Sequence, residues 1–510
     1  MQKNIVVCAD GTGNTTIKGR GTNVFKIFEA VDTSEHRSKQ PQRLQAAIYH
    51  DGVGTESLKW LRLITGAGGW GLSRNVKQLY GELARVYVPG DRIFLFGFSR
   101  GAFTVRTLAG LITTCGILDV SRPEYSTNEL FWRGIRAAYA AYRKKYQTRL
   151  SLWLRGKLTP DPDALRRQFS VEIPGFTFPT EPVIHFIGVW DTVDAVGLPF
   201  RLADLINEFI WRFKFPDTSL SAHVGAACHA LAADEARESF TPLLWDERAE
   251  DPAAPRIQQV WFAGVHSNVG GGYPRQGMSL VALDWMMAQA ERHGLRFHPD
   301  QRRLYHGAAD VNDKAYDSRS GFGVFYRWKP RNIQALSAQC RVEAKVHRSV
   351  FDRVSRGTEG YAPGALPPDC RVVSSTATSE SLAAIAATVK NAFAGTPPLL
   401  EQQRSARRLG LAGYWLLILT VAALVALMLW TFVADNLEAA HGWRDRVKGL
   451  ASTALSSHWV NIAARTVWNY PWLCGSAAVA LLTLLLVEKH LDRRYSSFWH
   501  GVRSHLRAAA

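Results

Sequence analysis

The sequence predicts an α/β fold with a mostly parallel sheet and helical insertions, followed by a C-terminal region of a different kind. Short apolar runs that suit buried strands recur through the first part of the chain, and helical patterns separate them. One such run, Ile93–Phe96, passes through two glycines directly into a helical pattern. Beyond Pro397, long uncharged apolar runs replace this alternation. The 510 residues therefore divide into an α/β part, residues 1–395, and a second region, residues 396–510.

The first predicted strand, Ile5–Ala9, is followed by the glycine-rich turn Asp10–Asn14. A turn of this kind after a buried strand suggests a phosphate loop, but the Walker spacing and a full Gly-x-Gly-x-x-Gly are both missing. A loop that offers backbone N–H groups to an oxyanion is the better interpretation, and an ordinary tight turn is the alternative. Because no signal-peptide pattern precedes this strand, we expect the α/β part to fold in the cytoplasm.

The second predicted strand, Ala47–His50, leads towards a glycine-rich loop at Gly66–Gly71. Apolar residues at helical spacing then predict a helix over Asn75–Val88. Pro89 and Gly90 turn the chain into the next strand.

That strand, Ile93–Phe96, ends in Gly97-Phe98-Ser99-Arg100-Gly101 and is followed by a helical pattern. Strand, sharp turn and helix form the setting in which Gly-x-Ser-x-Gly is a nucleophile elbow. The glycines leave room for the tight turn, and the helix dipole favours negative charge beside Ser99. Ser99 is therefore the candidate nucleophile, with the backbone N–H groups of Arg100 and Gly11 as candidate oxyanion donors. A chance match in a chain with 41 glycines is the alternative.

A helical insertion is predicted at about residues 119–182, where the strand pattern lapses. Its clearest helix, Glu129–Tyr146, carries aromatic and apolar residues along one face, namely Trp132, Ile135, Tyr139 and Tyr142. An insertion of this kind after the nucleophile helix suits a lid or a substrate-access region. A helix that simply packs on the domain is supported equally well.

The candidate acid follows the next predicted strand, Val183–Trp190. In open α/β sheets, side chains at the carboxyl ends of strands converge on the site. A carboxylate at this place can hold a histidine in the required tautomer. Asp191 comes immediately after the strand and is preferred, while Asp194 and a role in capping or turn formation stay open.

The segment Ala222–Ala236 is predicted to be a helix that carries polar residues. Among these, His229 and Asp234 resemble metal ligands in type. Since nothing completes a recognised metal spacing, we expect both to make structural hydrogen bonds, and we expect neither a metal nor a cofactor in the protein.

The candidate base, His266, lies in a glycine-rich loop after Gln259–Gly264, the last predicted strand. A histidine just beyond a strand end can act as a general base. His50 is a rival, but it precedes Ser99 in the chain. The order Ser99, Asp191, His266 is the order found in α/β-hydrolases, and it predicts an α/β-hydrolase-like sheet.

The composition limits the partners. Hydrophobic residues make up 47% of the chain, which excludes global disorder. The formal net charge of +17 suggests a nucleic acid or a membrane surface as partner. No zinc-finger spacing, RNA-binding aromatic signature or long basic run is present, so we expect no nucleic acid. The six scattered cysteines indicate free thiols in a reducing compartment.

Several motifs occur in order over roughly residues 3–370: Asp10–Asn14, Gly52–Thr55, Gly97–Phe103, Gly188–Val193, His229–Glu235, Gly264–Tyr273, Val346–Val350 and Tyr361–Pro363. This set resembles the uncharacterised α/β-hydrolase family that includes type VI secretion lipase effectors with phospholipase A activity. The resemblance implies Ser99, Asp191 and His266 as nucleophile, acid and base. For an effector it also implies a secretion apparatus or an immunity protein as partner. The chain departs from the family pattern at Asn268, where an aspartate is expected.

Two apolar runs in the second region predict transmembrane helices, at residues 411–433 and 468–487. The second run is short, and a re-entrant or buried helix is its alternative. Basic residues are denser before the first run and after the second than between them. The positive-inside rule then predicts a multi-pass hairpin in the inner membrane, with both tails and the α/β part in the cytoplasm.

The sequence as a whole predicts a membrane-anchored serine esterase or lipase that cleaves phospholipid acyl esters, with membrane lipids as its partner. One alternative is an esterase or thioesterase for a soluble acyl substrate. Another is a membrane-inserting toxin or scaffold with an inactive hydrolase fold, which the intact set of Ser99, Asp191 and His266 disfavours. An effector delivered to a target cell and a resident enzyme share these sequence features.

Overall fold

The computed structural model of the chain describes residues 2–11, 21–34, 43–51, 68–144, 176–177, 184–193, 218–251, 253–374, 377–395, 398–438 and 467–509. The chain forms two compact units. The first contains Met1–Tyr326, Pro330–Gly395 and Trp499–Ala510, and the second contains Arg327–Lys329 and Thr396–Phe498. This division differs from the predicted one at its C-terminal end, since Trp499–Ala510 group with the first unit.

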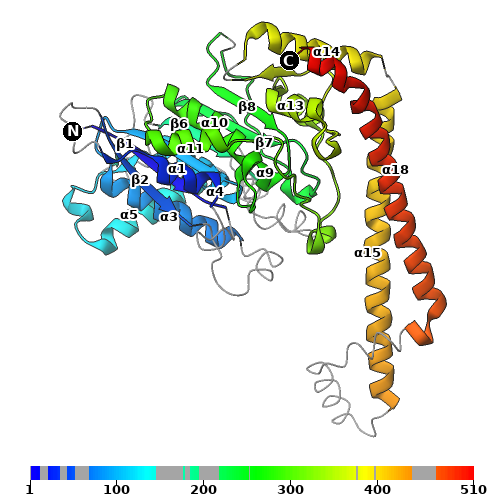
Figure 1. Cartoon of the computed structure of the whole chain (residues 1–510). Helices are drawn as coiled ribbons and strands as arrows, with labels where there is room; N and C mark the ends of the chain where they lie inside the picture. Colours follow the sequence, from blue (N-terminus) through cyan, green and yellow to red (C-terminus); the bar gives the residue numbers. More distant parts are fainter. Residues whose placement is uncertain are drawn as a thin grey trace, which may run out of the picture. The chain divides into compact units, whose positions relative to one another are not determined.

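The first unit is built on a parallel sheet of eight strands in the order β10-β9-β8-β7-β6-β3-β1-β2, which confirms the predicted α/β fold (Figure 1). Its strands are β1 (Lys3–Ala9), β2 (Leu44–His50), β3 (Arg92–Phe98), β6 (Ile184–Trp190), β7 (Val224–Ala232), β8 (Ile257–Phe262), β9 (Lys345–His347) and β10 (Arg371–Val373). A separate antiparallel pair joins β4 (Ile117–Leu118) to β5 (Phe176–Thr177).

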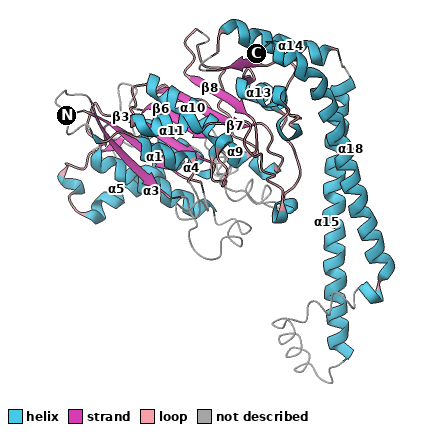
Figure 2. Ribbon diagram, viewed as in Figure 1, coloured by secondary structure: helices cyan, strands magenta, loops and turns pink. Residues whose placement is uncertain are grey.

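Helices cover both faces of this sheet (Figure 2). On one face lie α3 (Gly68–Val86), α4 (Arg100–Cys115) and α5 (Asn128–Lys144), and on the other lie α1 (Asn23–Ala30), α10 (Gly277–Arg292) and α11 (Pro299–Ala308). Alternate residues of β1 enter the two cores: Ile5 and Val7 belong to the first, and Val6 and Cys8 to the second. A strand buried on both faces needs an unbroken apolar run, so β1, β3, β6 and β8 are recognisable in the sequence.

Among the described residues, the first unit also contains α9 (His266–Gly270), α12 (Ile333–Cys340), α13 (Arg348–Arg356) and α14 (Ser379–Ala394). Single 3₁₀ turns lie at Pro123–Tyr125, Glu238–Phe240, Gly321–Phe325 and Thr358–Gly360. His266 is thus the first residue of a short helix rather than part of a loop. The glycine-rich loop predicted at Gly66–Gly71 is helical from Gly68 onward, while residues 66–67 lie outside the described part.

Two predictions about strands are wrong. The helix predicted over Ala222–Ala236 is strand β7, which pairs with β6 and β8 on its two sides. Its alanines favour a helix locally, but both neighbouring strands offer it hydrogen bonds, and tertiary context overrides the weak local propensity. Gln259–Gly264 is also not the last strand, because β9 and β10 extend the sheet beyond β8. Each of these has three residues, too few to show a period.

The second unit contains α15 (Pro398–Glu438) and most of α18 (Pro471–Ala509). Among the described residues, one helix segment is long and apolar enough to cross a membrane, the 21 residues Gly410–Trp430, with a mean hydropathy of 2.3. The apolar segment Pro471–Ala480 is shorter. The structure therefore offers one candidate span where the sequence predicts two, and the multi-pass hairpin stays a prediction.

The end of the chain packs into the first unit. Trp499 is 1% exposed, and its indole N–H donates to the Pro363 carbonyl oxygen over 3.1 Å. The Trp499 and Phe393 rings lie 5.9 Å apart, and Val502 and Leu506 are buried as well. The last turns of α18 thus complete the core of the first unit.

Candidate active site

Ser99 occupies a strained turn between β3 and α4. Its backbone has φ 58° and ψ −123°, a conformation that residues other than glycine rarely adopt. Its N–H donates to the Trp190 carbonyl oxygen of β6 over 3.0 Å, which ties the turn to the neighbouring strand. A Cβ atom at Gly101 would collide with the Ala9 carbonyl oxygen, and one at Gly97 would lie 2.7 Å from the Ala102 nitrogen. Both glycines are required by this close approach.

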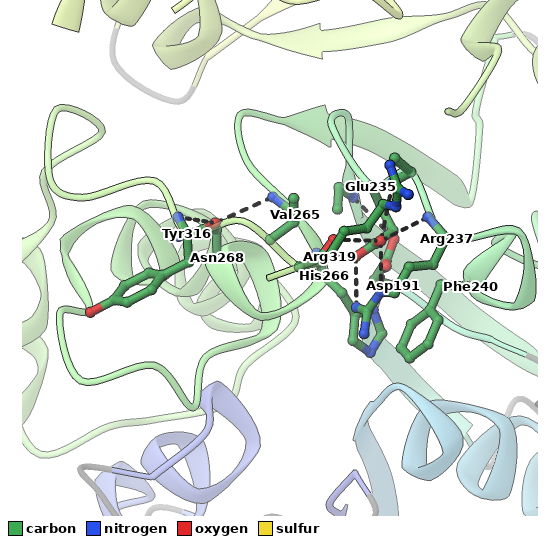
Figure 3. Close-up of polar contacts among 12 residues, drawn as sticks. Asp191, Glu235, Arg237, Phe240, Val265, His266, Asn268, Tyr316 and Arg319 are labelled. Carbon is green, nitrogen blue, oxygen red and sulfur yellow. Dashed lines mark hydrogen bonds and ion pairs between the residues drawn. The ribbon is translucent and has the colours of Figure 1, made fainter. Parts of the chain in front are cut away.

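Asp191 and His266 are in direct contact (Figure 3). Asp191 follows β6, and its Oδ2 lies 2.5 Å from His266 Nδ1. Its Oδ1 accepts a hydrogen bond from the Ala232 N–H at the end of β7, over 3.0 Å. Asp191 also has a positive φ, of 41°, so the backbone turns sharply as it leaves the strand. The ends of three neighbouring strands therefore bring the candidate acid and base together.

An arginine that sequence reasoning missed holds the far side of the same carboxylate. Arg331 Nη1 lies 2.6 Å from Asp191 Oδ1, and Arg331 Nη2 lies 2.8 Å from Asp191 Oδ2. Nη1 also donates to the Ala232 carbonyl oxygen, and Nη2 donates to that of Phe240 over 2.6 Å. The arginine is buried. Such a two-pronged pair is among the strongest ways in which a side chain can hold a carboxylate.

The His266 ring lies between two aromatic rings. The centroid of Phe98, the residue before Ser99, is 4.6 Å away, and the centroid of Phe240 is 4.9 Å away with its ring edge-on. The His266 backbone N–H donates to Glu235 Oε2 over 3.2 Å, and Glu235 in turn pairs with Arg237 (Figure 3). Aromatic packing and this carboxylate fix the orientation of the base.

These surroundings determine the protonation states. Burial lowers the pKa of His266 more than Asp191 and Glu235 raise it, so the imidazole is neutral at pH 7. Burial alone would raise the pKa of Asp191, but Arg331 and His266 outweigh it and hold that pKa well below its usual range. Glu235 likewise has its pKa lowered, to about 2, because Arg237 outweighs burial. A neutral imidazole that donates from Nδ1 to a carboxylate has Nε2 left to accept a proton.

Ser99 is connected to His266 through its neighbour Phe98. Within the part of the chain that the structure describes, no hydrogen bond of 3.5 Å or less joins the Ser99 hydroxyl to the imidazole. Phe98 directly precedes Ser99, and its ring packs against that of His266 at a tilt of 32°. Catalytic hydrogen bonds in unliganded enzymes are often long and tighten when substrate binds.

The two candidate oxyanion donors differ. The Arg100 N–H is at the first position of α4, where no carbonyl within the helix can accept it. The Gly11 N–H donates to Asp10 Oδ1 over 2.6 Å and is therefore occupied in this structure. The carboxylate of Asp10 also accepts from Thr22 and Tyr49, which anchors the start of the loop. Residues 12–14 of this loop lie outside the described residues.

The side chain of Arg100 is a further feature of the site. Among the described residues, its guanidinium has no hydrogen-bond or ion-pair partner. It is partly buried, and this burial lowers its pKa to about 10, so that it is protonated at neutral pH. Directly after the candidate nucleophile thus stands a cation with no hydrogen-bond or ion-pair partner in the described part of the chain.

The other candidates take structural places or lie outside the described residues. His50 ends the edge strand β2, and its Nδ1 lies 2.6 Å from the Asp51 carbonyl oxygen. His229 accepts from the Thr192 N–H over 3.0 Å, and Asp234 accepts from Gly264 and Tyr361, which confirms that both make structural hydrogen bonds. Outside the described residues lie Asp194, Gly52–Thr55 and most of the predicted insertion.

Asn268 joins the helix of His266 to a later loop. Its Oδ1 accepts from the N–H groups of Val265 and Tyr316 over 3.4 and 3.3 Å, and its Nδ2 donates to the Lys314 carbonyl oxygen (Figure 3). An aspartate would keep the two accepted bonds and lose the donated one. The departure from the family pattern therefore concerns how the loop is held. No cluster of three His, Cys, Asp or Glu side chains suited to a metal occurs among the described residues.

Among the comparisons with known proteins, a family model covers more than half of the chain. The family model described as the catalytic domain of Tle1-like type VI secretion system (T6SS) phospholipase effectors matches residues 3–289. An uncharacterized protein of Saccharomyces cerevisiae is 27% identical over 258 residues, which cover 48% of this chain and 33% of the yeast protein. The chain thus matches about a third of that relative's length.

Two solved structures are also similar. The crystal structure of an uncharacterized protein from Pseudomonas aeruginosa is 17% identical, covers 98% of this chain and 66% of that one, and has a TM-score of 0.35. The structure of the Tle1 effector bound to the VgrG spike from the type 6 secretion system is 18% identical, covers 54% and 51% of the two chains, and has a TM-score of 0.28.

Proposed function

The chain belongs to the Tle1-like family of type VI secretion phospholipase effectors, and on this premise we propose that it is a membrane-anchored serine hydrolase that cleaves phospholipid acyl esters. The observation that carries the proposal is that the candidate nucleophile and the pair of candidate acid and base all follow the C-terminal ends of strands in one parallel sheet. Ser99 occupies a turn with positive φ after β3, and His266 contacts Asp191 beside it. Carboxyl edges of parallel strands are where α/β folds place their sites.

In the proposed mechanism, Ser99 Oγ attacks the ester carbonyl carbon while His266 Nε2 takes its proton. Asp191 accepts the hydrogen bond from Nδ1 and stabilises the imidazolium that forms. The Arg100 N–H, with a second donor from the Asp10–Asn14 loop, holds the oxyanion. The alcohol then leaves with the proton from His266, and an acyl-serine remains. Water, activated by His266, releases the fatty acid and regenerates the hydroxyl.

Phospholipid suits three features of the chain. The net charge of +17 attracts the protein to anionic membrane surfaces. The Arg100 guanidinium, next to Ser99, has no hydrogen-bond or ion-pair partner among the described residues and can meet a phosphate from the headgroup. The apolar segment Gly410–Trp430 holds the site near lipid. As a family effector, the protein reaches a target cell through a secretion apparatus, and an immunity protein protects the producing cell.

The test of the function is product identification. We expect the purified full-length protein to release free fatty acid and a lysophospholipid from phosphatidylglycerol vesicles, as detected by mass spectrometry. Vesicles of an ether-linked analogue, which has no acyl ester, should yield neither product. Hydrolysis of a short-chain ester without any attack on vesicles would favour an esterase for soluble substrates. No hydrolysis of either would contradict the proposal.

A second prediction concerns the anchor. The proposed anchor can be tested with a deletion variant. Because Trp499–Ala510 belong to the first unit, this variant should lack residues 396–498 only. The rings of Phe393 and Trp499 lie 5.9 Å apart, so a short glycine-serine linker can join the ends. The shortened protein should move from the membrane fraction to the soluble fraction and keep its activity on a short-chain ester. Its rate on vesicles should fall by roughly tenfold or more, since it loses the basic flanks and the apolar segment.

A point-variant control avoids the deletion. Leu419 and Val425 are 64% and 48% exposed on α15, and aspartate at a span centre costs about 3 kcal/mol. Leu419→Asp with Val425→Asp should therefore also release the protein from membranes. A protein that sediments with membranes after both changes would place the lipid contact elsewhere. Loss of activity on both substrates would show that residues 396–498 serve the catalytic fold.

A further inference from the structure

We propose that Arg331 is a positioning residue that holds Asp191 against His266 and thereby sets the acid limit of activity. The proposal rests on the proposed function, in which His266 is the base. Arg331 does not touch the reacting atoms. It acts through Asp191, from a loop 140 residues away in the sequence.

The geometry assigns this role because the Asp191 carboxylate receives four donors in one arrangement. Oδ1 accepts from Arg331 Nη1 and from the Ala232 N–H, and Oδ2 accepts from Arg331 Nη2 and from His266 Nδ1. The planar guanidinium meets both oxygens at once, which fixes the rotation of the carboxylate about its Cβ–Cγ bond. Without the arginine, only the Ala232 N–H would oppose the imidazole. Asp191 would then be free to turn away from Nδ1.

Arg331 is itself held on two further sides. Its Nη atoms also donate to the carbonyl oxygens of Ala232 and Phe240. Phe240 packs edge-on against His266, so the arginine connects the carboxylate to a wall of the imidazole pocket. The guanidinium is therefore part of the frame around the base, and a lysine cannot make the same four bonds.

The charge of Arg331 acts in the same place as its hydrogen bonds. The charged groups that face His266 are Asp191, Glu235 and Arg237, and the groups that face Asp191 are Arg331, His266 and the neutral His229. Both carboxylates favour the protonated imidazole, and Arg237 disfavours it. A buried cation on Asp191 thus limits how strongly that carboxylate can hold a proton on His266.

The sign of the expected pH effect follows from this arrangement. The acid limb of kcat/KM reports protonation of the base in the free enzyme. Removing the positive charge at residue 331 should favour protonated His266 and also protonated Asp191, which titrate as a coupled pair. Both changes move the acid limb to higher pH.

Two substitutions separate orientation from charge. Arg331→Gln removes both the positive charge and the two-pronged contact with Asp191. It should therefore move the acid limb of the kcat/KM profile up by about one pH unit and lower kcat by about 100-fold. Arg331→Lys keeps the charge and loses the two-pronged contact. It should lower kcat about as much while the limb stays near that of the parent protein.

Arg353 provides a matched control. It is also fully buried, and it donates to the carbonyl oxygens of Val311 and Asp313 and pairs with Glu359. Arg353→Lys and Arg353→Gln should lower the melting temperature but leave the acid limb in place. Full-length proteins are compared by short-chain ester hydrolysis and by the pH dependence of fluorophosphonate labelling at Ser99, with circular dichroism to confirm folding.

The outcomes are distinguishable. A limb that moves up in Arg331→Gln and stays in Arg331→Lys, with kcat reduced in both, supports the proposal. If Arg331→Gln does not fold, a loss of kcat in folded Arg331→Lys still supports the orienting role. Unchanged kcat in Arg331→Lys, or an equal shift in the Arg353 variants, overturns it while the proposed function stands. Absence of Ser99 labelling in the parent protein overturns the proposed function and this inference with it.

Discussion

Replacing Ser99 with alanine should lower ester hydrolysis by about a millionfold, the scale of loss when a triad loses its nucleophile. Labelling by a fluorophosphonate probe should vanish as well. The reason is local, because Ser99 occupies the strained turn after β3 and Phe98, the residue before it, packs against His266. A backbone with positive φ persists only where the surrounding structure demands it, and such strain gathers at functional sites. The measurement is hydrolysis of short-chain esters and vesicles, with circular dichroism to confirm folding.

Ser267 is the matched control for this experiment. It follows His266 directly, is partly exposed, and has no part in the proposed mechanism. Ser267→Ala should therefore keep both activity and labelling. If the Ser99→Ala protein is labelled and active at another serine, the nucleophile is wrongly assigned. If the parent protein and both variants are inactive, the alternative of a membrane-inserting scaffold with an inactive hydrolase fold gains support.

Replacing Asp191 with asparagine should lower kcat by about ten thousandfold, as in the serine proteases where the same change leaves the histidine in the wrong tautomer. The amide can donate to Nδ1, so Nε2 no longer accepts the serine proton. The change also leaves the Arg331 guanidinium buried beside a neutral group, which should cost about 3–5 kcal/mol of stability. We therefore expect a lower melting temperature together with the loss of activity.

Asp194→Asn is the comparison that decides between the two candidate acids. It should keep most of the activity, because Asp191 already supplies the contact to His266. An inactive Asp194→Asn protein beside a nearly normal Asp191→Asn protein would show that the acid is wrongly chosen. The pH dependence of stability gives a further check. The folded pKa of Asp191 is lowered, so its contribution is present above the unfolded pKa and is lost as the pH falls towards the folded one.

The sequence by itself predicted five strands of the sheet, namely β1, β2, β3, β6 and β8, and it proposed the three main residues of the candidate site. Strands such as Ile93–Phe96 are buried on both faces, and an unbroken apolar run is a local property that neighbouring residues display. The nucleophile turn is local as well, since two glycines and a serine within five residues specify it. The ordered motifs from Asp10–Asn14 to Tyr361–Pro363 indicated the same family that the catalytic-domain match shows.

Only the tertiary structure decided the rest. Strand β7 is rich in alanine and becomes a strand because β6 and β8 pair with it from both sides. The ion pair of Arg331 with Asp191 joins residues 140 positions apart, and no motif around either residue predicts that the two are in contact. Trp499 lies beyond the predicted membrane region and nevertheless completes the first unit. Periodicity records which side of its own element a residue faces, whereas the partner on that side is chosen by packing across the whole chain.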